Sequence, residues 1–375
     1  MENKERAKRF IFDLKKIDRR EFLKFFLLGA GLFLTNSGCF PEKEIKKFEN
    51  FSLLPPENPS PAFLRGINLN APFLWQDVDY PEKITNAFEN AKEIGARNIR
   101  VFINDLFEPE LGRYNFDVLK KIKKLAQISP FPLQVDLFDA FSLSHFGKIN
   151  LVHSSSPYPS PYLAGDFFND ERLRNFFLRR VETIILFFGD IKNIVSWSVA
   201  NELEPKGTKE EKREILTMWY EEIIKKIKEI DPERPIISGL ADPELIDEEK
   251  LKEIGLTANT IHFYPNLFQN FQESRKIPLV CQEIGFPSKI AGIKIPDSLY
   301  DIFFSNFLND SFLNFAEINE KKGLLKLKTD SFWFWRLSYE GDSHQDGFEI
   351  IPQRIPRTLE TIFSLRRILE SLYPL

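Results

Sequence analysis

The stretch that decides the fold runs from Ile194 to Glu202 and reads Ile-Val-Ser-Trp-Ser-Val-Ala-Asn-Glu. A short, mostly apolar run comes first, and an Asn-Glu pair follows it directly. Such a run predicts a buried β-strand. Polar residues at the end of a buried strand are typical of α/β proteins, in which functional side chains gather at the carboxyl ends of parallel strands.

Similar runs recur along the chain at intervals that leave room for helices. Their flanks carry Gly, Pro, Asn or Asp, as strand ends should. The eight predicted strands are Phe63–Leu69, Asn98–Ile103, Leu133–Phe138, Ile194–Ala200, Pro235–Gly239, Thr260–Tyr264, Pro278–Glu283 and Ser331–Trp335.

The intervals carry amphipathic patterns with apolar residues three and four positions apart, which predict helices. The clearest faces are Ile84, Ala87, Phe88 and Ala91; Leu173, Phe176, Phe177, Val181, Ile184, Ile185 and Phe188; and Leu216, Trp219, Tyr220, Ile223, Ile227 and Ile230. Eight strands with intervening helices predict a single (β/α)8 TIM barrel over residues 63–375. An open, doubly wound sheet is the alternative, but no glycine-rich nucleotide fingerprint follows an early strand.

Composition excludes several classes of protein. Of 375 residues, 43% are hydrophobic and 28% charged, which suits a globular protein with a real core. The net charge of −4 gives no electrostatic reason to expect nucleic acid as a partner. Two cysteines rule out a disulfide scaffold, and no clustered His, Cys and Asp set predicts a metal. We expect a monomer without cofactor or metal.

The N-terminal residues resemble an export signal. Arg19-Arg20 with Phe22-Leu23-Lys24 resembles a twin-arginine motif, and the apolar run 25–34 is too short to span a membrane. Cys39 follows at the place of a lipoprotein cysteine. We therefore expect a signal over residues 1–39, with lipidation at Cys39 as one outcome, and a Pro-rich spacer over 40–62. The mature chain would be periplasmic or extracellular, and it would contact a membrane only through the leader or a lipid anchor.

Two glutamates end two different predicted strands, Glu202 after Ile194–Ala200 and Glu283 after Pro278–Gln282. In a barrel, the carboxyl ends of the strands surround one cavity. A carboxylic acid that protonates a departing oxygen, together with a carboxylate that acts as nucleophile or base, is the equipment of glycoside hydrolysis. Arg100 beside Glu283 would keep that carboxylate ionised, because a nearby cation favours the charged form. Cys281, two positions before Glu283, would share its face of the strand and is expected to be buried.

A family resemblance rests on six motifs in order: Arg65-Gly66-Ile67-Asn68-Leu69, Asn98-Ile99-Arg100, Ser196–Glu202, His262-Phe263-Tyr264, Glu283-Ile284-Gly285 and Trp335. Together they resemble the clan A glycoside hydrolases, most closely family 5, which includes cellulases and mannanases. The resemblance covers about residues 63–370 and implies a barrel that hydrolyses a carbohydrate.

The resemblance also implies roles for individual residues. Glu202 matches the general acid/base and Glu283 the nucleophile of a retaining double displacement. Arg100 matches the support of the nucleophile, and Asn201 the partner of the sugar 2-hydroxyl. The remaining matches are His262 and Tyr264 at the catalytic centre and Trp335 as the sugar platform.

Two positions depart from the family pattern. Phe138 stands where a histidine is usual, with Asp139 as a polar substitute, and Leu203 follows Glu202 where many members have proline. Both leave the sugar and its linkage open. Trp75, after the first predicted strand, is a candidate for a second sugar platform. A carbohydrate-binding or transglycosylating barrel, acting in exopolysaccharide handling, is the alternative function.

Overall fold

The structure is a computed structural model that describes residues 58–103, 107–108, 112–139, 168–205, 207–264, 277–286, 289–290, 293–309, 329–339, 342 and 348–373. All of them belong to one compact unit, Leu53–Leu375. The expected signal, Cys39 and most of the spacer lie outside these ranges, so these expectations stay predictions. Among the described helices, none is both long and apolar enough to cross a membrane.

Eight parallel strands close into a barrel, in the order β1-β10-β7-β6-β5-β4-β3-β2. This confirms the predicted (β/α)8 barrel and excludes the open sheet. The strands are β1 (Gly66–Asn70), β2 (Ile99–Phe102), β3 (Leu133–Asp136), β4 (Ile194–Ser198), β5 (Ile236–Ile237), β6 (Leu256–Phe263), β7 (Leu279–Ile284) and β10 (Ser331–Trp335). The short strands β8 (Lys289–Ile290) and β9 (Ile293–Lys294) pair with each other outside the barrel.

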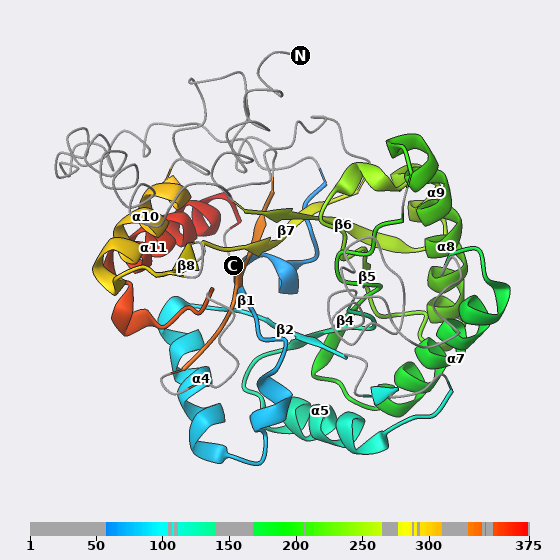
Figure 1. The fold of residues 1–375 in the computed structure, drawn as a ribbon, viewed down its shortest axis with the longest axis horizontal. Coiled ribbons are helices and arrows are strands. Elements are labelled where there is room, and N and C mark those ends of the chain that lie inside the picture. The colour runs from blue at the N-terminus through cyan, green and yellow to red at the C-terminus, as the bar shows by residue number, and fades with distance from the viewer. Residues whose placement is uncertain are drawn as a thin grey trace. The chain divides into compact units, whose positions relative to one another are not determined.

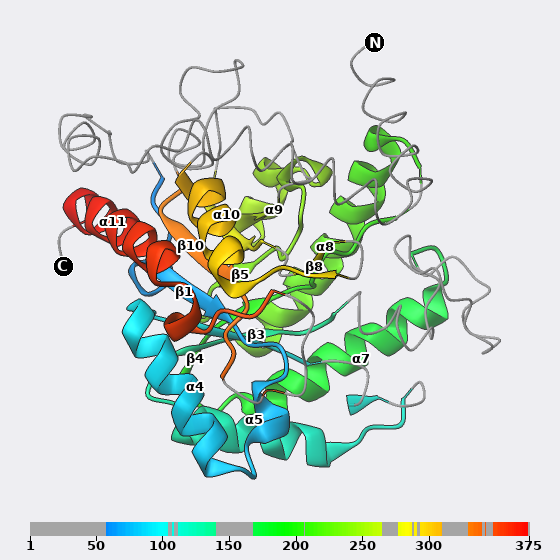
Figure 2. The same ribbon diagram turned by 60° about the vertical axis from the view of Figure 1, so that its left-hand side comes forward.

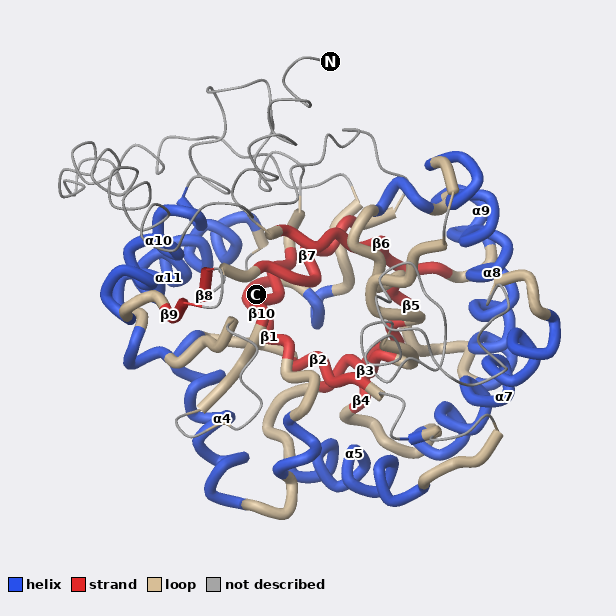
Figure 3. The backbone as a smooth tube through the Cα atoms, viewed as in Figure 1, coloured by secondary structure: helices blue, strands red, loops and turns tan. Residues whose placement is uncertain are grey.

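Helices surround the barrel, and Figure 3 shows the strands as an inner ring inside them. They are α4 (Pro81–Ile94), α5 (Phe116–Ile128), α7 (Glu171–Phe188), α8 (Lys209–Ile230), α9 (Glu248–Glu253), α10 (Asp297–Asn309) and α11 (Pro356–Leu372). The last two pack side by side in the views of Figures 1 and 2.

Local sequence explains where these helices begin and end. The side chain of Thr208 caps α8 together with Glu211 in a reciprocal capping box. Asp170 accepts from two backbone amides at the start of α7. Gly95 ends α4 at a φ of 79°, a conformation that glycine adopts without strain. Most residues of the predicted apolar faces are buried, whereas Phe176 and Ile230 at the edges remain partly exposed.

The two faces of the barrel strands differ in chemistry. The outward residues, such as Ile67 and Val101, belong to the large hydrophobic core shared with the helices. Inside the barrel, a small apolar cluster lies mostly on the early residues of the strands and consists of Leu64, Ile237, Ala258, Val280 and Trp333. Buried polar side chains, including Asn70 at the end of β1 and Asp136 at the end of β3, place hydrogen-bonding groups at the end where the motifs lie.

The first turn of the domain differs from the prediction. Residues 62–64 form a short 3-10 helix, and β1 begins at Gly66 instead of Phe63. Just before this turn, the backbone amide and hydroxyl of buried Ser60 both donate to Asp330, at 2.8 and 2.5 Å. The chain is therefore already attached to the start of β10 at Ser60.

Candidate active site

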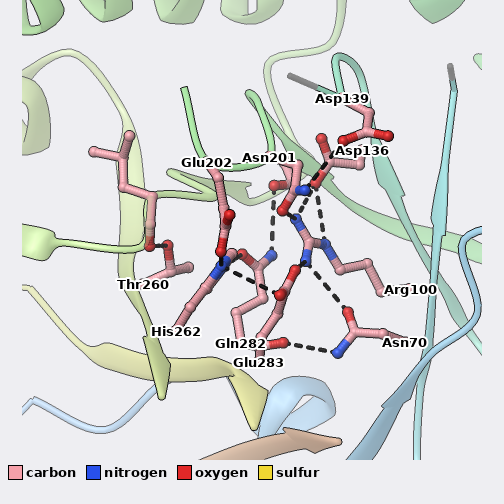
Figure 4. Close-up of polar contacts among 12 residues, drawn as sticks. Asn70, Arg100, Asp136, Asp139, Asn201, Glu202, Thr260, His262, Gln282 and Glu283 are labelled. Carbon is pink, nitrogen blue, oxygen red and sulfur yellow. Dashed lines mark hydrogen bonds and ion pairs between the residues drawn. The ribbon is translucent and has the colours of Figure 1, made fainter. Parts of the chain in front are cut away.

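The structure brings the two predicted glutamates together at the carboxyl ends of the strands. Glu202 follows β4, and Glu283 lies within β7. His262, from β6, contacts both: its Nδ1 lies 2.6 Å from Oε1 of Glu202 and 3.4 Å from Oε2 of Glu283. Figure 4 shows these three side chains pointing toward one another. Glutamates 81 positions apart in sequence thus face one site.

A β-bulge in β7 turns Glu283 into the barrel. Cys281 lies opposite Ile261 of β6, but the next aligned pair is Glu283 with His262, so β7 contains one extra residue, Gln282. The register against β10 shifts at the same place. Because a bulge interrupts alternation, Gln282 and Glu283 both direct polar groups inward.

The same bulge corrects the expectation for Cys281. Its side chain packs in the outer hydrophobic core and does not share the face of Glu283. It is fully buried, and burial raises the pKa of its thiol well above the ordinary value. Cys281 is therefore a structural residue.

Arg100 lies fully buried beside Glu283 and organises the site. Its Nη1 donates to Oε1 of Glu283 at 2.8 Å and to Oδ1 of Asn70 at 3.2 Å. Its Nη2 donates to Asn201 at 3.0 Å, and both Nε and Nη2 donate to Asp136. Burial by itself would lower the pKa of Arg100, but the charges of Asp136 and Glu283 raise it overall.

Asp136 and Asn70 are site residues that the sequence did not reveal. Asp136 is fully buried; burial raises its pKa to about 6, although Arg100 and a hydrogen bond from Ser198 act in the opposite direction. Asn70 fixes the end of β1, because its amide also donates to the backbone carbonyl of Gln282 at 2.9 Å. Asp136 lies within the predicted strand Leu133–Phe138 and Asn70 directly follows the predicted strand Phe63–Leu69, and these positions were a signal that could have identified both.

The charge state of Glu283 reflects a balance. Burial raises the pKa of Glu283 above its ordinary value, and the nearby carboxylate of Glu202 adds to this effect. The guanidinium of Arg100 and the hydroxyl of Tyr264, which donates to Oε2 at 2.7 Å, lower it. Arg100 therefore favours the ionised form as expected, but burial has the larger influence on this pKa.

Glu202 is held in an unusual backbone conformation. Its φ is 51°, which is uncommon for a residue with a side chain. Its amide donates to the carbonyl oxygen of Gly239 at 2.9 Å, so the residues after β4 and β5 hold it in place. Such strain persists only where the surroundings determine it, and it is frequent at functional sites.

The ring of His262 is fully enclosed, and burial lowers its pKa to about 4. The imidazole is therefore neutral near neutral pH. Its second nitrogen, Nε2, lies 3.3 Å from Oε1 of Gln282.

The other predicted binding residues are brought to the site, with one exception. Asn201 donates to Asp139 at 3.1 Å, so Asp139 does lie beside the candidate catalytic residues. Phe138 points away from them and packs against Phe177 of α7. Trp335 ends β10, and its ring lies 5.6 Å from that of Phe102.

Trp75 is the exception. Its side chain is 3% exposed and packs in the hydrophobic core, and its indole nitrogen donates to the carbonyl of Pro72 at 3.0 Å. The expectation of a sugar platform at Trp75 was wrong, because an apolar tryptophan face gains more from burial in the core than from exposure in a loop.

Within the described ranges, Glu202, His262 and Glu283 form the one group whose donor atoms could hold a metal ion. His262 already hydrogen-bonds to Glu202, and Glu283 accepts hydrogen bonds from Arg100 and Tyr264. The positive charge of Arg100 would repel a metal ion bound at this site. The arrangement is thus better suited to proton transfer than to metal binding.

Comparison with known proteins finds no matching family model and no curated protein that matches in sequence. Solved structures do match. An endo-β-1,4-mannanase from Thermotoga petrophila is 17% identical, with a TM-score of 0.57, over 83% of this chain and 78% of that one. An exo-β-1,4-mannosidase from an Opitutaceae bacterium is 15% identical, with a TM-score of 0.60, over 83% of this chain and 60% of that one.

An endo-1,4-β-mannanase from Rhizomucor miehei is 16% identical, with a TM-score of 0.54, over 84% of this chain and 100% of that one. The fold of this chain is thus the barrel found in these glycoside hydrolases. This agrees with the fold that the motifs implied.

Proposed function

We propose that this chain is a retaining glycoside hydrolase that cleaves a β-linked poly- or oligosaccharide. Glu202 would be the general acid/base and Glu283 the nucleophile. The support comes from the site geometry, the ordered motifs, and the shared fold of several glycoside hydrolases.

The observation that carries the proposal is the separation of the carboxylates. One oxygen of Glu202 and one of Glu283 lie within 4.8 Å of each other. Retaining enzymes place their carboxyl groups about 5–5.5 Å apart, whereas inverting enzymes leave about 6.5–9.5 Å for a water molecule. The short separation favours direct attack by Glu283 on the sugar.

In the first step, a carboxylate oxygen of Glu283 would bond to the anomeric carbon as the glycosidic C–O bond breaks, and Glu202 would give its proton to the departing oxygen. In the second step, Glu202 would take a proton from water, the water oxygen would bond to the anomeric carbon, and the bond to Glu283 would break. Arg100 and Tyr264, which contact Glu283, would disperse its charge whenever it is ionised.

Further contacts would hold the sugar. Asn201 and Asp139 present an amide and a carboxylate beside Arg100, suited to sugar hydroxyl groups. Trp335 would offer an apolar face to the ring. Matching structures include an endo-β-1,4-mannanase and an exo-β-1,4-mannosidase, so β-mannan is the first substrate to test.

The test is reducing-sugar release by the full chain from β-mannan, β-glucan, xylan and galactan, beside Glu202→Gln and Glu283→Gln. We expect one substrate to be hydrolysed and both variants to lose at least ~10³-fold in rate. The anomer released first, observed by proton NMR, should retain its configuration. Equal activity of wild type and Glu283→Gln would contradict the assignment, as would a folded wild type that binds glycans without cleaving or transferring them.

We also propose that the chain is exported and lipidated at Cys39. This rests on the arginine pair at 19–20, the short apolar run and the position of Cys39. An extracellular or periplasmic location suits an enzyme whose substrate is a polymer outside the cell.

A further inference from the structure

Gln282, the extra residue of the β7 bulge, lies under the catalytic pair and contacts His262 on one side and Ser198 on the other. Because an amide has one accepting end and one donating end, its orientation decides which protons its neighbours must carry.

Two contacts give the orientation of the Gln282 amide. Its NH2 group donates to Oγ of Ser198 at 3.4 Å. Its oxygen lies on the other side, beside the ring of His262. Because the donating end of the amide is directed at Ser198, Gln282 presents its accepting end to His262.

The tautomer of His262 follows from Gln282. The oxygen of Gln282 lies 3.3 Å from Nε2 of His262, so Nε2 must carry the hydrogen. Burial keeps the imidazole neutral near neutral pH, because its pKa is about 4. A neutral imidazole has one N–H group, so Nδ1 is left as an acceptor.

The two contacts of Nδ1 agree with this assignment. Its distance to Glu202 is 2.6 Å, which suits a hydroxyl hydrogen of a carboxylic acid donated to nitrogen. Its distance to Glu283 is 3.4 Å, too long for a good hydrogen bond. Glu283 instead receives its hydrogen bonds from Arg100 and Tyr264.

We propose that Gln282 is a positioning residue that fixes His262 as the Nε2–H tautomer, so that His262 accepts from Glu202 and keeps this glutamate protonated before catalysis. The proposal rests on the proposed function, since it explains how the acid is distinguished from the nucleophile. The proton stays on Glu202 until the glycosidic bond breaks, when it passes to the departing oxygen. The charged and titratable groups around His262 are Glu202, Glu283 and Arg100.

Loss of this orientation has a predictable consequence. If the amide of Gln282 were removed, the hydrogen of His262 could move to Nδ1 and donate to Glu202. A hydrogen bond to a carboxylate favours its ionised form, so Glu202 would lose its proton at lower pH. The basic limb of the pH–rate profile would then move down by about one pH unit.

The test uses the full chain labelled with ¹⁵N-histidine, without substrate, near neutral pH. The ring nitrogens of the four histidines are observed by NMR, and His262 is identified by the signal lost in His262→Gln. We expect wild-type His262 to carry its proton on Nε2. In Gln282→Met and Ser198→Ala we expect His262 to be in the Nδ1–H form or in a mixture of the two tautomers. In these variants the basic limb of the pH–rate profile should lie at lower pH, and kcat should change more than KM.

Ser196→Ala is the matched control. Ser196 lies two residues before Ser198 on β4, and its buried hydroxyl has no hydrogen-bond partner among the described residues. Its removal should change neither the NMR signals of His262 nor the pH profile. If Gln282→Met does not fold, Ser198→Ala decides the question.

The proposal is overturned if wild-type His262 carries its proton on Nδ1 or on both nitrogens near neutral pH. It is also overturned if folded Gln282→Met or Ser198→Ala leaves the tautomer unchanged. Because the NMR measurement needs no substrate, an inactive wild type with the Nε2–H tautomer would contradict the proposed function alone.

Discussion

The backbone amide of Glu202 donates to the carbonyl oxygen of Gly239 at 2.9 Å, which joins the ends of β4 and β5. Gly239 has a φ of 79°, and a Cβ atom there would lie 1.7 Å from the carbonyl oxygen of Ala200. The position therefore needs glycine for both its conformation and its space. Through this contact, Gly239 holds the candidate acid in its left-handed conformation.

We expect Gly239→Ala to lower the free energy of unfolding by about 2 kcal/mol or more and to reduce kcat by displacing Glu202. The clash is with backbone, which cannot rotate away as a side chain can. Urea unfolding and steady-state kinetics are the measurements. Gly189→Ala is the control, because Gly189 has a φ of −56° at the end of α7. Equal stability of the two variants would contradict the argument.

The hydrogen bond from Tyr264 to Glu283 provides a test of the pKa of Glu283. Its hydroxyl lowers the pKa of Glu283, so Tyr264→Phe should raise that pKa. A nucleophile must be ionised, and activity is lost as pH falls through its pKa. The acid limb of kcat/KM should therefore move to higher pH, by about half a unit to one unit.

The matched control for this pH test is Tyr339→Phe. Tyr339 donates to Asp77 at 2.7 Å, the same distance as between Tyr264 and Glu283, but it is not a hydrogen-bond partner of Glu283. Its removal should leave the acid limb unchanged. If the acid limb of kcat/KM in Tyr264→Phe stays in place or moves to lower pH, the group that titrates in this limb is not Glu283.

Much of the barrel could be predicted from sequence, because short apolar runs with turn residues mark each strand. The predicted strand Leu133–Phe138, for example, contains β3, and Ser331–Trp335 coincides with β10. The pairing of Glu202 with Glu283 followed from the rule that strand ends share one face of the barrel. Only the identities of the strands and their ends were needed for this.

What could not be predicted depends on register and on contacts across the barrel. Strict alternation placed Cys281 beside Glu283, but the bulge at Gln282 breaks alternation, and the sequence gives no local sign of it. Asp136 contacts Arg100 through side chains from neighbouring strands, a pairing that no short motif encodes. Trp75 was misplaced because a loop tryptophan looks the same in sequence whether it is buried or exposed.

The proposed export signal makes a prediction that does not depend on the barrel. In a bacterial host that processes lipoproteins, the full chain should lose residues before Cys39 and enter the membrane fraction. Mass spectrometry of the mature N-terminus should find a lipid-modified cysteine. Cys39→Ala should abolish the modification, while a change of Arg19 and Arg20 to lysine should retain the chain inside the cell. An intact N-terminus in the wild type would contradict lipidation, and unchanged export of the Arg19 and Arg20 variant would contradict the twin-arginine signal.

Asp136 and Arg100 provide a test of the buried charges beside Glu283. Both side chains are fully buried, and Arg100 keeps its charge at all accessible pH values. Asp136→Asn removes one of its two anionic partners and leaves the guanidinium under-compensated. Breaking a buried pair in this way costs about 3–5 kcal/mol, so the urea midpoint should fall markedly.

Asp190→Asn, which breaks the exposed contact with Lys123, should change stability by less than about 1 kcal/mol. Because Arg100 also donates to Glu283 and Asn201, its displacement should reduce kcat in Asp136→Asn but not in Asp190→Asn. If Asp136→Asn is as stable and as active as wild type, Arg100 is positioned by Glu283, Asn70 and Asn201 alone.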